Sequence, residues 1–397
     1  MDTNMSVSSA IILAAGEGKR LRPLTKYRPK PMLPAATKPI LEHVFDQLID
    51  AGVSKLVVVV GYRRERVQSY FGSTYRNVPI SYVVQEKQLG TGHALLAAES
   101  EVTGACLAIN GDQIVDSRII GDAVRSHDSS VAATIASLHR SNVESYGGVL
   151  VEDGLVTDIV ENPRDGRDYR LNAGVYVLEP AAFDGVRAAP SRNGEHLLVD
   201  GLATLVDTGE TVRGVASEGL WTDATYPWDL LDVSAELFQT GLVNGDPEIG
   251  GREATIHDDA VIRGPVVIDW DCAIGPGAVV GPDVCLGENV TIGANAVVER
   301  SVVDADTTIG ANATVTECVT GTGVEIGPGS TIPGGPGDVR VGDTVHEDEA
   351  LGALLADRVI DRGGIDYVPG ALVGPETEIQ TGTTVRGTLA GGTEVRS

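Results

Sequence analysis

The sequence is poor in lysine and cysteine, and it contains no long apolar run. Only six of its 397 residues are lysine, and none of them follows Lys87. The four cysteines lie far apart and form no Cys-x-x-Cys pair, which argues against a zinc site or a disulfide framework and fits a reducing compartment. Residues 1–9 are polar without a basic start, and no window approaches about 18 apolar residues. We therefore expect no signal peptide, no membrane span and a cytoplasmic location.

Positive charge is scarce in the chain as a whole. Acidic residues number 56 against 30 lysines and arginines, so the formal net charge is −26. We expect a chain this negative to bind neither nucleic acid nor an anionic membrane surface, because both would repel it. An acid-rich, lysine-poor surface suits a cytosol near 1 M salt, where the Debye length is about 3 Å. The composition favours a halophilic protein, and an ordinary acidic protein is the alternative.

The first 235 residues alternate apolar, β-rich runs with segments of helical spacing. This alternation is typical of an α/β domain with a mostly parallel sheet. Ligands of such domains bind at the carboxyl ends of the strands, where this chain has glycines and acidic residues. We expect strands at 10–15, 55–60, 80–85 and 105–110, and helices at 40–51, 64–71 and 92–100.

A six-residue repeat begins after Asn244. An aliphatic residue recurs at every sixth position from Ile256 to Ile292, and a small apolar residue follows each of them four positions later. This period predicts a left-handed parallel β-helix in which three hexapeptides form one coil.

The repeat is expected to stop after Ile292 and to resume at Ile326. Between residues 333 and 366 we expect an inserted loop with a short helix at 350–359. The predicted domains are residues 1–240 and 254–397, joined by a linker at 241–253.

The first predicted strand continues into a segment rich in glycine and cationic side chains, LAAGEGKRLRPLT at residues 13–25. Gly16 and Gly18 allow backbone N–H groups to approach a polyphosphate closely. Six cationic side chains lie between Lys19 and Lys30, and a proline on each side of Lys30 restricts the backbone. We predict a phosphate-binding loop here. It is neither a dinucleotide fingerprint, because Leu21 stands where a glycine is needed, nor a P-loop.

Further candidate residues follow later strands. Gln85 carries both a donor and an acceptor, which suits a pyrimidine edge, and Gly90 allows a base to lie against the main chain. Asp112 follows the fourth predicted strand, and together with Asp223 it could hold one Mg²⁺ that bridges phosphates. His93 is expected to cap the helix that begins beside it or to pack on it.

Five motifs occur in a fixed order: LAAGEGKRLRPLT, PKPMLP, QEKQLGTGHA, NGD and WTDATYPWDLL, followed by the hexapeptide repeats. Together they resemble the sugar-1-phosphate nucleotidylyltransferases. The closest likeness is to the archaeal-type bifunctional nucleotidylyltransferase/acetyltransferases, which are similar to N-acetylglucosamine-1-phosphate uridylyltransferase, and there is a likeness to glucose-1-phosphate thymidylyltransferase. The resemblance covers nearly the whole chain and implies a Rossmann-like nucleotidyltransferase domain followed by the β-helix.

The resemblance also implies a role for each matching residue. The catalytic residues would be Arg20, Lys30 and Asp112. The nucleotide would contact Leu13, Ala15, Gly16, Gly18, Gln85, Gly90 and Thr91. The sugar would contact Gly147, Glu161 and Asn172, and Mg²⁺ would bind Asp112 and Asp223.

The implied reaction joins UTP or dTTP to N-acetylglucosamine 1-phosphate or glucose 1-phosphate and releases pyrophosphate. The nucleophile is already an anion, so no protein base or covalent intermediate is needed, and catalysis consists of positioning and charge neutralisation. The resemblance further implies a homotrimer that assembles through the β-helix.

The C-terminal half departs from the bifunctional pattern where an acetyl-CoA site would lie. Residues 345–350, VHEDEA, are acidic where that pattern is basic, and the half has no lysine for the phosphates of coenzyme A. His346 is the candidate general base for acetyl transfer, and a solvated surface histidine is the alternative. Thr225 also replaces a glycine two positions after Asp223.

Three functions therefore stay open. The first is a nucleotidylyltransferase with a working acetyltransferase half, for which acetyl-CoA would be the second substrate. The second is the same transferase with a β-helix that only assembles subunits or binds a regulator. The third is a catalytically silent regulatory subunit, which the presence of Arg20, Lys30 and Asp112 disfavours.

Overall fold

The computed structural model describes residues 7–141, 143–192, 194–245 and 254–396. The chain forms two compact units that interleave in sequence. The sheet unit comprises Met1–Glu17, Pro29–Met32 and Ile40–Thr222, and the β-helix unit comprises Gly18–Arg28, Leu33–Pro39 and Asp223–Ser397. The domain boundaries at residues 240 and 254 stay a prediction, and most of the predicted linker 241–253 lies outside the described residues.

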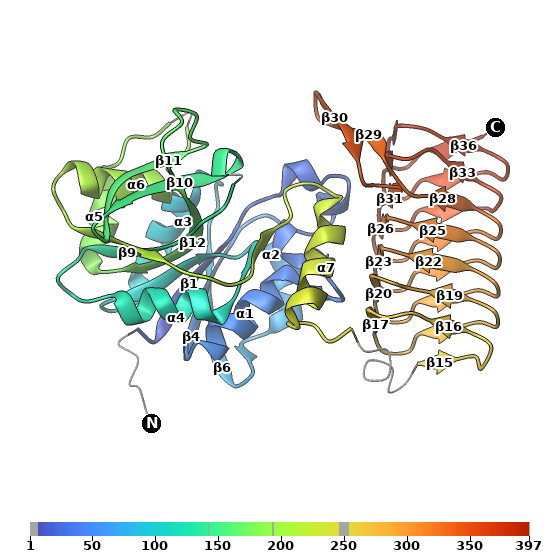
Figure 1. The fold of residues 1–397 in the computed structure, drawn as a ribbon, viewed down its shortest axis with the longest axis horizontal. Helices are drawn as coiled ribbons and strands as arrows, with labels where there is room; N and C mark the ends of the chain where they lie inside the picture. Colours follow the sequence, from blue (N-terminus) through green and yellow to red (C-terminus); the bar gives the residue numbers. More distant parts are fainter. Residues whose placement is uncertain (1–6, 142, 193, 246–253, 397) are drawn as a thin grey trace. The chain divides into compact units, whose positions relative to one another are not determined.

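The sheet unit is built on a ten-stranded sheet with the order β10-β11-β13-β9-β12-β7-β1-β4-β6-β5 (Figure 1). Four consecutive strands of this sheet run parallel, namely β7 (Cys106–Asn110), β1 (Ser9–Ala14), β4 (Lys55–Val60) and β6 (Val78–Val84). These are the four strands predicted from the sequence. The others are β5 (Thr74–Tyr75), β9 (Ala133–Leu138), β10 (Gly147–Glu152), β11 (Leu155–Glu161), β12 (Arg170–Leu178) and β13 (Val212–Ala216). Because β12 pairs antiparallel with both β7 and β9, the sheet as a whole is mixed.

Helices cover both faces of this sheet, as Figure 1 shows. One face packs against α1 (Ile40–Asp50), α2 (Arg64–Phe71) and α4 (Ser117–Ser126), and the other against α3 (Thr91–Ala97), α5 (Pro180–Ala188) and α6 (Leu198–Asp207). Successive residues of a strand point to opposite faces, so Ile12 joins the first core while Ile11 and Leu13 join the second. Burial on both faces explains why β4 reads as a continuous apolar run.

Short elements complete the sheet unit and its connections. They are the 3₁₀ helices η1 (Lys19–Leu21), η2 (Leu24–Lys26), η3 (Lys30–Met32), η4 (Glu99–Glu101) and η5 (Val143–Ser145), the two-stranded sheet of β8 (Gln113–Val115) and β14 (Trp221–Asp223), and the hairpin of β2 (Pro34–Ala35) and β3 (Lys38–Pro39). No described helix is both long and apolar enough to cross a bilayer.

The β-helix unit contains stacked coils whose strands form three parallel sheets (Figure 1). The first sheet is β15 (Thr255–Ile256), β18 (Ala273–Ile274), β21 (Thr291–Ile292), β24 (Thr308–Ile309), β27 (Glu325–Ile326), β32 (Ile360–Asp361), β35 (Glu378–Ile379) and β38 (Glu394–Val395). The second is β16 (Val261–Ile262), β19 (Val279–Val280), β22 (Val297–Glu299), β25 (Thr314–Thr316), β28 (Thr331–Pro333), β33 (Asp366–Tyr367) and β36 (Thr384–Val385). The third is β17 (Val266–Ile268), β20 (Val284–Leu286), β23 (Ser301–Val303), β26 (Cys318–Thr320), β31 (Ala353–Leu355), β34 (Ala371–Val373) and β37 (Thr388–Leu389). This is the predicted β-helix.

The expected break in the repeat between Ile292 and Ile326 is wrong. Ile292 pairs with Ile309 and Ile309 with Ile326, so the coils continue through this region. Each of these two coils has 17 residues instead of 18, because the steps from Val298 to Val303 and from Val315 to Thr320 are five residues instead of six. All four of these side chains are buried. A corner that is one residue shorter still allows the coils to stack. It shifts the following residues by one position, so a strict six-residue pattern no longer detects them.

The short helix expected at 350–359 is also wrong. The chain forms β31 there, and this strand pairs in parallel with β26 and β34. Neighbouring strands on both sides satisfy its backbone groups, which overrides the helix propensity of alanine and leucine. The insertion near 333–366 is instead a hairpin of β29 (Gly337–Val341) and β30 (Thr344–Glu349).

One α-helix belongs to the β-helix unit. Helix α7 (Asp229–Thr240) packs against β23, β26 and β2. The hydroxyl of Ser234 on α7 accepts a hydrogen bond from the backbone N–H of Ala36, with 3.0 Å between nitrogen and oxygen. This contact fixes the β2–β3 hairpin within the unit.

Candidate active site

Two of the predicted catalytic residues meet in the sheet unit. The Nζ of Lys30 lies 3.0 Å from Oδ2 of Asp112. The lysine side chain is 11% exposed and the aspartate side chain 37%, so the pair is accessible mainly from the carboxylate side. Asp112 follows the carboxyl end of β7, where parallel α/β sheets bind their ligands.

Two glycines shape the neighbourhood of this pair in different ways. A Cβ built on Gly111 would lie 2.9 Å from Cβ of Ala14 and 3.0 Å from Cγ2 of Ile12, so a glycine is needed for β7 to end close against β1. A Cβ on Gly16 would meet no atom within 4 Å. The fold does not need a glycine at residue 16, and the space beside it suits the close approach of a ligand.

Leu13 and Ala15 are predicted to contact the nucleotide, and their carbonyl groups form hydrogen bonds within the sheet unit. The oxygen of Leu13 accepts a hydrogen bond from the N–H of Gly111 at 2.9 Å, and that of Ala15 accepts one from the N–H of Tyr62 at 3.3 Å. These bonds hold the end of β1 against the residues that follow β7 and β4.

The amide of Gln85 is partly engaged inside the protein. Its Nε2 donates to the carbonyl of Gly90 at 3.1 Å and lies 2.9 Å from Nδ1 of His93. Both N–H groups therefore have acceptors, whereas Oε1 has no hydrogen-bond partner among the described residues. His93 lies in the first turn of α3 and contacts this amide from there.

The loop with Gly90 and Thr91 rests on a segment that the sequence did not single out. Gly90 has a φ of 99°, and a Cβ there would lie 2.5 Å from the carbonyl oxygen of His196. The hydroxyl of Thr91 accepts from the N–H of Leu198 at 3.0 Å. No sequence pattern marked His196 or Leu198, because their contribution is made by the backbone.

The three predicted sugar-binding residues come together. Gly147 pairs with Glu161 in the β10–β11 register. A Cβ on Gly147 would lie 3.4 Å from Cβ of Asn172 and 3.7 Å from Oε1 of Glu161. The structure thus unites residues from three different strands.

The side chains of Asn172 and Glu161 differ in their hydrogen bonds and in the charges around them. The Nδ2 of Asn172 donates to the hydroxyl of Tyr176 at 2.9 Å, and its Oδ1 accepts from the N–H of Gly174 at 3.1 Å. Partial desolvation, together with the charge of Asp200, raises the pKa of the solvent-exposed Glu161. One oxygen of Asp200 is fully buried without a hydrogen-bond partner among the described residues.

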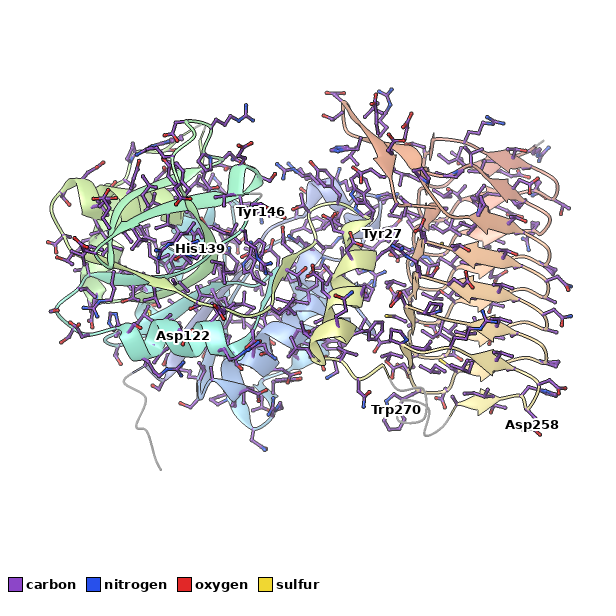
Figure 2. All side chains as sticks on the ribbon, viewed as in Figure 1. Tyr27, Asp122, His139, Tyr146, Asp258 and Trp270 are labelled. Atoms are coloured by element: carbon purple, nitrogen blue, oxygen red, sulfur yellow. The ribbon has the colours of Figure 1, made fainter. Side chains whose placement is uncertain are left out.

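An aromatic pair lies beside this cluster in the chain. Tyr146, labelled in Figure 2, packs edge-on against Trp221 with 5.0 Å between ring centroids. The indole N–H of Trp221 donates to the carbonyl of Ala173 at 3.0 Å. Tyr146 precedes Gly147 and Ala173 follows Asn172, so these contacts support the backbone next to both predicted site residues.

The remaining predicted site residues belong to the β-helix unit. Gly18 has a φ of 68°, and its carbonyl accepts hydrogen bonds from the N–H of Leu21 at 3.1 Å and the hydroxyl of Thr25 at 2.9 Å. Arg20 is exposed and forms no ion pair or side-chain hydrogen bond with a residue that the structure describes. Its guanidinium is available for an anionic ligand.

Asp223 is held by a turn that precedes α7. Its Oδ2 accepts from the hydroxyl of Thr225 at 2.7 Å, so the residue that replaces the usual glycine contacts the predicted metal ligand directly. Oδ2 of Asp229 accepts from the N–H groups of Thr225 and Tyr226 at 2.8 and 2.7 Å. Burial, with a smaller contribution from Asp223, raises the pKa of Asp229 to about 6. Asp229 is not among the predicted site residues, although it is the first residue of α7, where an acidic side chain is favoured.

The donor set fits Mg²⁺ bound mainly by phosphates. Among the described residues, no three His, Cys, Asp or Glu side chains cluster to hold a metal ion. Mg²⁺ needs no such cluster, because it often keeps its waters and binds one or two carboxylates plus substrate phosphates. The partly exposed carboxylate of Asp112 beside Lys30 is suited to that mode.

His346 lies in an aromatic cluster of the β-helix unit. Its ring centroid is 4.5 Å from that of Tyr226 and 5.2 Å from that of Trp228, and these two rings stack on each other. The histidine is half-buried, so it is not a fully solvated surface residue.

Two family models match parts of the chain. The family described as "Nucleotidyl transferase" matches residues 9–240, and the one described as "GMPPB C-terminal domain" matches residues 262–396. The bifunctional protein GlmU of Methanococcus maripaludis is 36% identical over 273 residues, which cover 68% of this chain and 62% of that protein. The chain thus spans less than two thirds of the length of such relatives.

Two further comparisons concern the N-terminal part. The UTP–glucose-1-phosphate uridylyltransferase AglF of Haloferax volcanii is 36% identical over 225 residues, which cover 55% of this chain and 92% of that protein. A crystal structure of UDP-glucose pyrophosphorylase complexed with UDP-glucose superimposes with a TM-score of 0.53 at 23% identity and covers 59% of this chain and 99% of the other. At that identity the structure supports the fold alone. The chain belongs to the nucleotidyl transferase family, as its N-terminal motifs predicted.

Proposed function

We propose that this chain is a Mg²⁺-dependent sugar-1-phosphate nucleotidylyltransferase that makes a UDP- or dTDP-sugar. A phosphate oxygen of the sugar 1-phosphate attacks the α-phosphorus of UTP or dTTP. The bond from the α-phosphorus to the oxygen that bridges to the β-phosphorus breaks, and pyrophosphate leaves with the electron pair. The nucleophile is an anion, so the chain needs to supply no base.

The observation that carries this proposal is the ion pair of Lys30 and Asp112 at the end of β7. Each partner has chemistry that a phosphate ligand would use: the ammonium binds a phosphate oxygen, and the carboxylate binds a divalent cation. Mg²⁺, when bound at Asp112, supplies positive charge that offsets the charge of the phosphates. Lys30 is largely buried, which strengthens its interaction with a phosphate that displaces water. The roles of Gly18, Arg20 and Asp223 rest on the family resemblance.

Gln85 supports the choice of a uracil or thymine base. With both of its N–H groups engaged by Gly90 and His93, the amide offers a ligand its carbonyl oxygen. This oxygen accepts from the N3–H of uracil or thymine, whereas N3 of cytosine has no hydrogen to donate. Gln85 thus favours UTP and dTTP over CTP without distinguishing between them.

The sugar is proposed to lie beside Gly147, Glu161 and Asn172. Gly147 brings the two polar side chains close because it has no Cβ to separate them. A carboxylate accepts hydrogen bonds from sugar hydroxyls, and an amide binds hydroxyl or acetamido groups. Both glucose 1-phosphate and N-acetylglucosamine 1-phosphate fit this set, and direct assay has to choose between them.

For the C-terminal half we propose assembly of a homotrimer rather than acetyl transfer. His346 is occupied by its aromatic neighbours Tyr226 and Trp228. The hairpin that carries it is acidic, whereas the phosphates of coenzyme A require cations. Sedimentation of the full chain should give the mass of three chains, and a monomer at all concentrations would contradict the trimer.

Pyrophosphate release by the purified full chain tests the nucleotidyl transfer. UTP, dTTP and CTP are each combined with glucose 1-phosphate and N-acetylglucosamine 1-phosphate in the presence of Mg²⁺, over a series of KCl concentrations. We expect release with UTP or dTTP and a much lower rate with CTP. Absence of release in every combination would reject the activity and leave the silent regulatory subunit.

A thiol-release assay tests the second activity. Glucosamine 1-phosphate and acetyl-CoA are added to the same preparation, and free coenzyme A is measured at each KCl concentration. We expect none above the blank. Release that is lost in His346→Ala would instead establish the acetyltransferase.

A further inference from the structure

We propose that the β-helix positions the phosphate loop, residues 18–30, and that Arg28 is the positioning residue through which it acts. This inference rests on the proposed function, since it assigns the C-terminal half a part in nucleotidyl transfer. Arg28 was counted in the sequence as one of six cations near the phosphates. In the structure its guanidinium instead pairs with carboxylates of the β-helix.

The guanidinium of Arg28 bridges two carboxylates of the β-helix. Its Nη1 lies 2.5 Å from Oδ2 of Asp304, and its Nη2 lies 2.9 Å from Oδ1 of Asp357. The three side chains are only 13%, 13% and 8% exposed. A planar guanidinium bound at two nitrogens has little freedom to rotate, so the contact fixes the direction of the chain at this residue.

The two carboxylates are themselves fixed. Oδ1 of Asp357 accepts from the N–H of Thr322 at 2.9 Å, and Oδ2 of Asp304 accepts from the hydroxyl of Thr322 at 3.1 Å. Asp304, Thr322 and Asp357 follow β23, β26 and β31, which are neighbouring strands of one sheet. Three successive corners of the β-helix therefore form a rigid acceptor for one arginine.

A second contact lies next to the first. Tyr27, labelled in Figure 2, packs under the guanidinium of Arg358 at 4.9 Å from its ring centroid. Arg358 in turn pairs with Glu376, with 2.6 Å between Nη2 and Oε1. Tyr27 and Arg28 are thus both held by corners of the β-helix.

The connection to Lys30 is short and stiff. One residue, Pro29, separates Arg28 from Lys30, and Pro31 follows, so both flanking residues have a fixed φ. On the other side, Ala36 is bound to Ser234 of α7 within the β-helix unit. A displacement of Arg28 would therefore be transmitted to Lys30, and small misplacements of a catalytic group cost up to about 100-fold in rate.

Four full-length variants test this role. Arg28→Met removes the charge but keeps much of the length of the side chain, and Arg28→Lys keeps the charge but has one amine where two carboxylates require a fork. The triple variant Arg28→Gln/Asp304→Asn/Asp357→Asn removes the buried charges together, so it avoids unpaired carboxylates if Arg28→Met does not fold. Arg362→Met is the matched control, because Arg362 pairs with Glu378 at a corner of the same β-helix and contacts neither Tyr27 nor Arg28.

The first measurement is amide hydrogen exchange of residues 18–30, which does not depend on activity. We expect about tenfold faster exchange in Arg28→Met and in the triple variant, and no change in Arg362→Met. Wild-type exchange of this segment in a folded Arg28→Met or triple variant would overturn the inference. Hydrogen exchange is measured without substrate. A wild-type chain without activity would therefore reject the proposed function, while the exchange data would still show whether the β-helix positions this segment.

The second measurement separates kcat and KM for UTP or dTTP. Positioning through Arg28 predicts that kcat, measured well below the melting temperature of each variant, falls about 10- to 100-fold in Arg28→Met and in the triple variant, and that Arg28→Lys recovers only part of it. A role confined to stability predicts a lower melting temperature with unchanged kcat at the same assay temperature. That second outcome would also overturn the inference.

Discussion

Lys30 and Asp112 form an ion pair, with Nζ 3.0 Å from Oδ2, in which the lysine is largely buried and the aspartate is not. Each of these two side chains neutralises the charge of the other. In the proposed reaction, a nucleoside triphosphate and its metal ion would replace this contact by two others, lysine to phosphate and carboxylate to cation. The ion pair compensates the charge of a largely buried ammonium.

Asp112→Asn should lower kcat at least about 100-fold, because an amide is a far poorer Mg²⁺ ligand than a carboxylate. The variant should still fold, but with a lower melting temperature, because the largely buried ammonium of Lys30 loses the charge of this carboxylate. Asp122→Asn is the control and should retain full activity, because Asp122 is a partly exposed residue of α4 that pairs with Arg125. Pyrophosphate release at the wild-type rate from Asp112→Asn would exclude this aspartate as the metal ligand.

Gly16→Ala should fold normally and bind nucleotide poorly. A Cβ at this position meets no protein atom within 4 Å, so the melting temperature should stay the same. If the backbone approaches the phosphates here, the added methyl should raise KM for UTP or dTTP at least about tenfold. Gly111→Ala gives the opposite pattern, because its Cβ would lie 2.9 Å from that of Ala14 and should lower the melting temperature. Unaltered KM in Gly16→Ala would move the phosphate site away from this glycine.

Gln85→Leu should reduce discrimination between UTP and CTP. The variant loses the carbonyl acceptor for N3–H, so kcat/KM for UTP or dTTP should fall about 10-fold or more, whereas the low value for CTP should change little. Competition between UTP and CTP in one reaction measures the ratio directly. An equal loss for both nucleotides would mean that Gln85 only supports Gly90 and His93.

Asp229 should make stability depend on pH between about 5 and 7. Its pKa is raised from 3.8 to about 6 in the folded protein, so the folded state holds the proton more tightly than the unfolded state does. Stability is then greatest below about pH 4 and is lost as the pH rises through about 6, by about 1 kcal/mol between pH 5 and pH 7. Denaturant unfolding at several pH values should show this loss in the wild type and not in Asp229→Asn. The same slope in both proteins would assign the effect to another group.

Salt should stabilise the protein up to molar concentrations. A net charge of −26 repels itself in dilute buffer, and about 1 M KCl shortens the screening length to about 3 Å. The melting temperature should therefore rise steadily from 0.1 to 2 M KCl. A flat or falling profile would favour the ordinary acidic protein over the halophilic one.

Part of the candidate site could be predicted from the sequence because it is encoded locally. Lys30 and Asp112 stood out as a scarce lysine between prolines and a carboxylate at a strand end, and the structure brings them together. The sugar residues Gly147, Glu161 and Asn172 were identified only through the family resemblance. Their proximity depends on the pairing of β10 with β11 and β12, which no local pattern specifies.

The residues that support the site were not predictable. His196 holds Gly90 through its backbone, whose carbonyl oxygen would lie 2.5 Å from a Cβ on Gly90. Asp229 acts on Asp223 through a turn, and Arg28 binds carboxylates that lie far along the chain at Asp304 and Asp357. The partners of Gly90 and Arg28 are distant in sequence and of common residue types, so composition and spacing contain no signal for them. Asp229 lies only six residues after Asp223, and its contacts depend on how the turn between them folds.

The sequence by itself determined the two architectures and the family, because hydrophobic period and glycine-rich motifs are properties of neighbouring residues. It also predicted the four parallel strands and the start of the β-helix. Tertiary structure alone decided that residues 18–28 belong to the compact unit of the β-helix, that its coils continue past Ile292, and that an acidic hairpin carries His346 to Tyr226 and Trp228. The physical reason is that packing and buried charge pairing join segments by complementary shape and charge, which are established only when the chain has folded.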